Sequence, residues 1–211
     1  MTGKETTLIL ASYFLGCLTT GYYWVKWRTG EDIREQGSGN VGARNVGRSL
    51  GASGFMVTFL LDLAKGALAV TAARYFGLTD EALIAALVAV VVGHSWPIQL
   101  RFHGGKGIAT SLGAILAYDN FIVLLLVALF IPLLALIRTF TIAGLLAFTL
   151  SPLAVFLCGL GNQEIAAVSL LAILLLVTHR KNIREEMARI FPGRAVKETS
   201  IRPQKGSHDE H

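Results

Sequence analysis

Residues 36–48 have the sequence QGSGNVGARNVGR and lie between two long apolar segments, residues 8–24 and 55–76. Each apolar segment can form a membrane helix, so the polar stretch between them decides where the chain leaves the bilayer. Its glycines allow backbone N–H groups to turn toward one point, and its serine, asparagines and arginines add donors there. The composition predicts an anion-binding loop, and phosphate is the first ligand to consider.

Residues 36–48 also have two weaker interpretations. The spacing of Gly37, Gly39 and Gly42 formally matches the dinucleotide-binding fingerprint, but that motif needs an apolar strand before it and a βαβ unit around it. Neither fits between two membrane helices. A flexible connector is the simpler alternative, although it would not need Asn40 and Asn45 between its glycines.

Composition sets the class of protein. The 211 residues are 53% hydrophobic and 16% charged, and the mean hydropathy is +0.57. These values predict an all-α polytopic membrane protein. The net charge is +5, and the basic residues lie beside apolar runs. Basic residues in such positions set the topology and face anionic headgroups, so we expect no nucleic acid partner. Cys17 and Cys158 lie inside apolar runs without a second ligand, which argues against a disulfide or a metal site.

Hydrophobic segments predict about seven crossings. They cover residues 8–24, 55–76, 82–96, 108–117, 121–137, 141–160 and 165–177. A cleaved signal peptide is the rival interpretation of the first, but only Lys4 precedes it and no small-x-small site closes it. Residues 108–137 as one helix would be about 45 Å long, so we expect a break at Tyr118-Asp119-Asn120. The short helix 108–117 then lies inside the bundle or is re-entrant.

The distribution of positive charge predicts the orientation. With the N-terminus outside, almost all basic residues fall on the inner face, where the C-terminus also lies. The inner basic residues before the C-terminal region are Lys26, Arg28, Arg34, Arg44, Arg48, Arg101, Lys106 and Arg138. Only Lys4 and Arg74 fall near the outer ends, and six crossings would invert part of this bias.

The end of the chain has a different character. Residues 180–191 have apolar side chains at helical spacing among basic ones, which predicts an amphipathic helix on the inner leaflet. Pro192-Gly193 ends it, and the polar residues 192–211 are expected to be a disordered cytoplasmic tail. We therefore expect a single membrane-embedded domain over residues 1–191.

Two further polar clusters occur at predicted membrane boundaries. One joins His94 to Gly104-Gly105-Lys106-Gly107, and the other is the segment 179–183. Both fall on the face predicted for residues 36–48. His94 is either a packing residue or a functional one. Asp62 and Lys65 lie one turn apart inside a predicted span and form either a structural ion pair or a substrate contact.

Together these clusters resemble the motifs of the bacterial PlsY family, the acyl-phosphate:glycerol-3-phosphate acyltransferases. The resemblance covers the chain except its tail. Residues 37–43, with Asn45 and Arg48, are similar to the first motif of the family. The second motif is matched by Gly93-His94, Pro97, Phe102 and residues 104–110, and the third by His179-Arg180, Asn182 and Ile183. A further match is Asp62-x-x-Lys65-Gly66.

The resemblance implies an activity. The family transfers a fatty acyl group from acyl phosphate to the primary hydroxyl of glycerol 3-phosphate, which produces lysophosphatidic acid and phosphate in the first acylation of bacterial phospholipid synthesis. It uses no cofactor, and it lacks the His-x4-Asp motif, which is also absent here. We therefore expect a monomeric multi-pass protein of the bacterial cytoplasmic (inner) membrane, with membrane lipids around it and its active site facing the cytoplasm.

The same resemblance implies site residues and no metal. The expected catalytic residues are Ser38, Lys106, His179 and Asn182. The expected phosphate-binding residues are Gly37, Gly39, Asn40, Gly42, Asn45, Arg48, Gly104, Gly105 and Arg180. Further candidates are Asp62, Lys65, His94 and Thr141. The general base is either His179 or, as we prefer, the phosphate of the acyl phosphate, whose second pKa is about 6–7.

Two positions depart from the family pattern. Arg44 stands where the family usually has threonine, and Arg138 is followed by Thr141 and Gly144 where the family often has two serines. A transporter of a phosphorylated metabolite is the competing function, since intramembrane charges and a phosphate site would suit it. The chain has no internal repeat and its motifs lie on one predicted face, which favours the enzyme. A purely structural subunit would not need three polar clusters.

Overall fold

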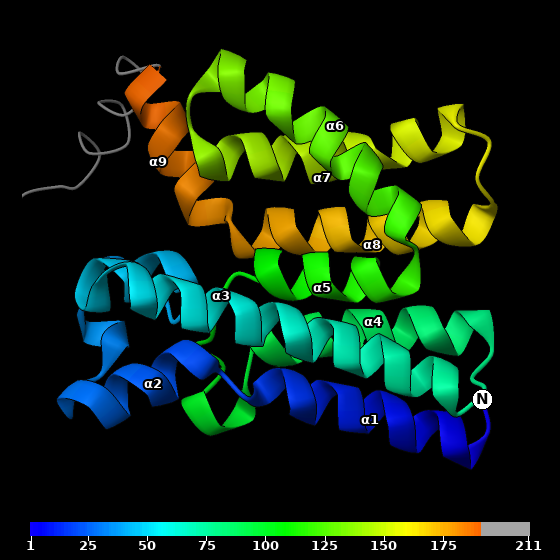
Figure 1. Cartoon of the computed structure of the whole chain (residues 1–211), viewed down its shortest axis with the longest axis horizontal. Helices are drawn as coiled ribbons and strands as arrows, with labels where there is room; N and C mark the ends of the chain where they lie inside the picture. Colours follow the sequence, from blue (N-terminus) through cyan, green and yellow to red (C-terminus); the bar gives the residue numbers. More distant parts are fainter. Residues whose placement is uncertain (191–211) are drawn as a thin grey trace, which may run out of the picture. The chain divides into compact units, whose positions relative to one another are not determined.

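The computed structural model describes residues 1–190, and this part of the chain contains helices and no strand. The predicted all-α membrane class is confirmed. The described chain divides into two units, residues 1–178 and a second unit that begins at His179. The first unit contains α1 Gly3–Cys17, α2 Thr20–Thr29, α3 Ala43–Tyr75, α4 Asp80–Ser95, α5 Ile108–Tyr118, α6 Asn120–Ile137, α7 Phe140–Leu157 and α8 Asn162–Thr178, with the short 3-10 helices η1 Ile33–Glu35 and η2 Ile98–Leu100 (Figure 1). The second begins with α9 Arg180–Ile190.

Five of the described segments are long and apolar enough to cross a membrane. They are Gly3–Thr29, Ala43–Tyr75, Asp80–Leu100, Asn120–Ile137 and Phe140–Leu157. The apolar helices α5 and α8 are shorter, with 11 and 17 residues. Every segment predicted as a crossing thus contains helix, whereas the number that cross the bilayer and the orientation of the termini stay predictions.

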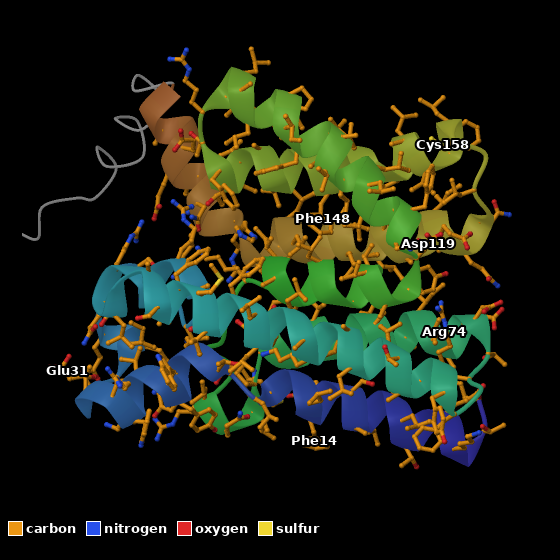
Figure 2. The ribbon with its side chains drawn as sticks, in the orientation of Figure 1. Phe14, Glu31, Arg74, Asp119, Phe148 and Cys158 are labelled. Atoms are coloured by element: carbon orange, nitrogen blue, oxygen red, sulfur yellow. The ribbon has the colours of Figure 1, made fainter. Side chains whose placement is uncertain are left out.

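Successive helices of the first unit run back and forth. Arg74, Asp119 and Cys158 lie toward one end of the bundle, and Glu31 lies toward the other (Figure 2). The loop after Glu31 and the loop after α4 meet at this second end, because Arg34 Nη1 donates a hydrogen bond to the Leu100 carbonyl at 3.2 Å. The two glycine-rich loops therefore share one end of the bundle, as predicted.

Glycines allow the helices that carry these loops to approach closely. A Cβ on Gly66 of α3 would lie 2.1 Å from the Thr110 carbonyl oxygen of α5. A Cβ on Gly16 of α1 would lie 2.1 Å from the Val90 carbonyl oxygen of α4. Small residues at such crossings are a common feature of membrane helix packing. They set the spacing of α3 against α5 and of α1 against α4, which are neighbours in the bundle (Figure 1).

The first predicted crossing, residues 8–24, lies within one apolar span, Gly3–Thr29, but this span consists of two helices. α1 ends at Cys17 and α2 begins at Thr20, with Leu18 at ψ 85° between them. The break frees the carbonyls of Cys17, the last residue of α1, and of Leu18, its C-cap residue. The Cys17 carbonyl accepts from Gln99 Nε2, and the Leu18 carbonyl accepts from Lys65 Nζ at 2.8 Å. Side chains distant in sequence therefore satisfy the broken end.

The predicted loop 36–48 is also shorter than expected. α3 begins at Ala43, so Asn45 and Arg48 lie on a helix rather than in a loop. Gly51, with φ 72° and ψ −164°, interrupts α3 and separates residues 43–50 from the long helix after it. The glycine-rich stretch is therefore a short loop that leads directly into a helix N-terminus.

The predicted break within 108–137 is confirmed. α5 ends at Tyr118 and α6 begins at Asn120. Asp119 caps α6, because its Oδ1 accepts from the Phe121 N–H at 2.8 Å. A side chain that satisfies one of the first N–H groups is a strong start signal for a helix, and it explains why the apolar run divides here.

Candidate active site

Asn45 supports the first glycine-rich loop from inside. Its side chain is only 3% exposed. Its Oδ1 accepts from the Ser38 N–H at 2.9 Å, and its Nδ2 donates to the carbonyls of Ile33 at 3.2 Å and Gln36 at 2.9 Å. Both amide hydrogens are thus used within the loop, and direct phosphate binding by Asn45 stays a prediction. Gly37 must be glycine, since its φ is +55° and a Cβ would lie 2.4 Å from Asn45 Oδ1.

The outer side of the same loop presents hydrogen-bond donors. Gly37, Ser38, Gly39 and Arg48 are exposed. Gly42 is the N-cap residue of α3 and has no side chain to cap the helix, while its own N–H donates to Asn40 Oδ1 at 2.9 Å. A helix N-terminus without a side-chain cap carries partial positive charge and free N–H groups. The arrangement suits an anion.

Replacing Asn45 with alanine is expected to lower the free energy of unfolding by about 1–3 kcal/mol, because the Ser38 N–H and two carbonyls lose their partner. The midpoint of thermal unfolding of the purified protein measures the effect. Ser53→Ala is the matched control, since Ser53 is exposed on the same helix and makes only a 3.4 Å hydrogen bond to Leu50. Equal midpoints for the two variants would contradict the role assigned to Asn45.

Asp32 and Arg34 hold this loop against the second one, and neither was predicted from the sequence. Arg34 forms an ion pair with Asp32 at 2.6 Å, donates to the Leu100 carbonyl and lies 5.1 Å from the ring centroid of Tyr22. The hydrogen bonds from Arg34 hold the pKa of Asp32 below its ordinary value. The sequence signal for this ion pair was the presence of opposite charges two residues apart. Their contact with Leu100 was not visible from sequence.

The backbone of the second loop is held from two sides. The Gly104 N–H donates to the Ser95 carbonyl at 3.1 Å, and the Gly105 N–H donates to the His94 carbonyl at 2.9 Å. On the other side, Thr178 Oγ1 donates to the Lys106 carbonyl at 2.9 Å. Lys106 is half-buried and is followed at once by Gly107, the N-cap residue of α5, whose φ is +88°. The position of Lys106 thus depends on the ends of α4 and α8.

Asp62, Lys65 and His94 form one buried polar cluster. Lys65 Nζ lies 2.9 Å from Asp62 Oδ1 and 2.8 Å from His94 Nδ1. The three residues are 2%, 6% and 3% exposed. The predicted mutual pairing of Asp62 and Lys65 is confirmed. His94 joins them, which agrees with the packing alternative for this histidine, while a direct substrate contact of any of the three stays a prediction.

Arg44 and Thr141 contact each other. Arg44 Nη1 of α3 donates to Thr141 Oγ1 of α7. The residue that departs from the family pattern thus engages the hydroxyl of Thr141, which is itself a candidate site group. At Gly144 a Cβ would meet nothing closer than Phe130 Cε2 at 3.9 Å. The position therefore has room for the serine that the family pattern expects.

The third motif lies in the second unit. His179 is buried, Asn182 is half-buried and Arg180 is exposed. The Ile183 N–H donates to the His179 carbonyl at 3.0 Å, which begins the hydrogen bonding of α9. Convergence of His179, Arg180 and Asn182 with Ser38 and Lys106 stays a prediction. Within residues 1–190, no group of three or more His, Cys, Asp or Glu side chains could hold a metal ion.

Comparison with known sequences identifies relatives over most of the chain. The family model described as glycerol-3-phosphate acyltransferase matches residues 6–189. Glycerol-3-phosphate acyltransferase 1 of Desulfitobacterium hafniense (strain Y51) is 46% identical over 179 residues, which cover 84% of this chain and 88% of the relative. The protein of the same name from Bacillus anthracis is 38% identical over 173 residues, or 82% of this chain and 92% of the relative.

Solved structures show the same fold. The crystal structure of PlsY, an integral membrane glycerol 3-phosphate acyltransferase, in its glycerol 3-phosphate form has a TM-score of 0.80 and 32% identity, covering 88% of this chain and 93% of that one. The lysophosphatidic acid form of PlsY has a TM-score of 0.78 and 30% identity over the same shares of the two chains.

Proposed function

Since the chain belongs to the glycerol-3-phosphate acyltransferase family and is an integral membrane acyltransferase, we propose that it acylates glycerol 3-phosphate. The acyl donor in this proposal is acyl phosphate. The products are lysophosphatidic acid and inorganic phosphate. The step is the first acylation of bacterial phospholipid synthesis. Ser38, Lys106, His179 and Asn182 are the catalytic residues in this proposal.

One observation carries the proposal most directly. Two donor-rich loops lie at the same end of the bundle, joined through the hydrogen bond from Arg34 to Leu100. The first ends at the uncapped N-terminus of α3 with exposed Arg48 beside it, and the second carries Lys106. Both proposed substrates bear a phosphate, and each loop suits one. The acyl chain would lie among the apolar helices.

The chemistry needs little beyond positioning and charge stabilisation. The primary hydroxyl oxygen of glycerol 3-phosphate attacks the carbonyl carbon, the bond from that carbon to the phosphate oxygen breaks, and phosphate leaves with the electron pair. Acyl phosphate is already an activated mixed anhydride, so orientation and electrostatics supply most of the rate. Ser38, Asn40 and Arg48 bind one phosphate. Lys106, His179 and Asn182 bind the other or stabilise the oxyanion.

The remaining parts of the proposal concern location. The protein is a monomer in the cytoplasmic (inner) membrane, its site faces the cytoplasm, and α9 lies on the inner leaflet as part of one membrane-embedded domain. Residue 191, the predicted end of that domain, lies outside the described residues. The basic residues at the loop end support this orientation. The tail 192–211 predicted as disordered lies outside the described residues.

Turnover of the purified protein tests the proposal. With palmitoyl phosphate and glycerol 3-phosphate, we expect lysophosphatidic acid and phosphate in equal amounts. Acyl-CoA and acyl carrier protein thioesters, offered separately, are expected to give no product. Product from a thioester but not from acyl phosphate would overturn the donor. No product from any donor, together with counterflow of glycerol 3-phosphate in vesicles, would favour the transporter.

The general base is tested by the pH dependence of His179→Gln. We propose that the phosphate of the acyl phosphate takes the hydroxyl proton, so the variant is expected to keep the shape of the wild-type pH profile of kcat. Loss of that pH dependence together with a fall in kcat of about 10²-fold or more would instead identify His179 as the base. Phosphate release measured across a pH series in one detergent distinguishes the two.

A further inference from the structure

The Lys65 ammonium forms an ion pair with Asp62 and hydrogen bonds to two further groups from other parts of the bundle. Nζ lies 2.9 Å from Asp62 Oδ1, 2.8 Å from His94 Nδ1 and 2.8 Å from the Leu18 carbonyl oxygen. The carbonyl is available only because the first span is broken after Cys17. A buried ammonium is tolerated when each of its donors is satisfied. The helix break, the ion pair and the histidine are therefore one connected assembly.

This assembly determines how His94 faces the second loop. With Lys65 donating to Nδ1, the neutral imidazole carries its proton on Nε2. The other edge of the ring lies over Gly105. A Cβ on Gly105 would be 1.9 Å from His94 Nε2 and 2.5 Å from Cε1, and its three nearest atoms all belong to this ring. The imidazole thus occupies the space beside the residue that precedes Lys106.

We propose that Asp62, Lys65 and His94 are positioning residues that place the Gly104-Gly105-Lys106 segment for catalysis. Lys65 orients the His94 ring, the ring packs against Gly105, and the His94 carbonyl accepts the Gly105 N–H at 2.9 Å. In this role the three residues act through Gly105 and Lys106 rather than through a contact of their own with substrate. The inference rests on the proposed function only in giving Lys106 a catalytic role.

A double-mutant cycle between His94 and Gly105 tests the contact. Gly105→Ala is expected to lower kcat/KM for phosphate release by about 10²-fold, since displacing a catalytic group by near 1 Å has a cost of that order. In a His94→Ala background the ring is absent, so the loss of kcat/KM caused by Gly105→Ala is expected to be smaller by a factor of about ten or more. Equal costs in the two backgrounds would overturn the proposal.

Gly104→Ala is the matched control on the neighbouring residue. A Cβ there would lie 2.2 Å from the His94 carbonyl oxygen and 2.4 Å from Pro97 Cδ. Neither atom is removed by His94→Ala, so Gly104→Ala is expected to lower kcat/KM by the same factor with and without His94→Ala. Relief of both glycine variants by His94→Ala would show general loosening of the loop and would also contradict the specific contact.

Hydrogen–deuterium exchange gives a readout that does not depend on activity. In His94→Ala and in Asp62→Asn/Lys65→Met, which leaves no buried charge unpaired, the amides of Gly104 and Gly105 are expected to exchange faster, while those of α6 and α7 remain as in the wild type. Uniformly faster exchange would mean a purely structural cluster and would overturn the inference. If the wild type showed no turnover, the proposed function would fail, whereas this exchange pattern would still decide the positioning role.

Discussion

Replacing Arg48 with methionine is expected to lower kcat/KM for glycerol 3-phosphate by about 10²–10³-fold, the usual cost of removing one donor aimed at developing charge. Arg48 lies in the first turns of α3, which follow the loop with the exposed residues 37–39, and is itself exposed. The midpoint of thermal unfolding is expected to stay that of the wild type, since an exposed charge contributes little to stability. Phosphate release and thermal unfolding of the same preparation measure both effects.

Two variants control this prediction. Arg48→Lys keeps the charge and loses the forked donor geometry, so its activity is expected to fall between those of the wild type and Arg48→Met. Arg28→Met removes a basic residue outside the motifs, whose guanidinium lies 6.0 Å from the Trp24 ring centroid, and should retain full activity. An equal loss in Arg28→Met and Arg48→Met would indicate a general charge effect and would remove Arg48 from the site.

Replacing Lys65 with methionine is expected to lower the free energy of unfolding by about 3–5 kcal/mol, because Asp62 then remains buried without its counter-charge. The ion pair is 2.9 Å long and both side chains are almost fully buried. In Asp62→Asn/Lys65→Met no uncompensated charge remains, so most of the stability is expected to return. Denaturant unfolding in detergent measures the wild type and both variants.

The double variant separates stability from activity. His94 still lacks the donor that orients it, so kcat is expected to stay low although the fold recovers. Lys26→Met is the surface control, because the hydrogen bond from Lys26 to the Gly30 carbonyl is exposed, and the stability of this variant should match that of the wild type. If the double variant were as unstable as Lys65→Met, the unpaired charge would not be the cause of the loss.

Apolar length and local capping made most of the helices predictable. The division of residues 108–137 follows from Asp119, whose capping role depends only on a neighbour two residues away. The loops that carry Ser38 and Lys106 were predictable for a similar reason, since glycine, asparagine and basic residues concentrate there. Such signals depend on the nearest residues along the chain, and tertiary packing did not override them.

The supporting contacts of the candidate site were not predictable in this way. Phosphate binding by Asn45 stays a prediction, and the sequence did not show that its side chain joins Ser38 to Gln36 within the loop. The pairing of Arg44 with Thr141 joins residues 97 positions apart. The side chains of asparagine and arginine can hydrogen-bond equally well to an anion or to other groups of the protein, so their presence in the sequence does not distinguish the two roles.

By itself the sequence determined the class of protein, the positions of the apolar helices, the family and the two loops that carry its first two motifs. Only the tertiary structure decided that the first span breaks at Leu18. It also decided that the Leu18 carbonyl, Asp62 and His94 meet around Lys65. The physical reason is distance along the chain. Helix periodicity and capping act between near neighbours, whereas the acceptors of a buried ammonium come from whichever helices pack around it.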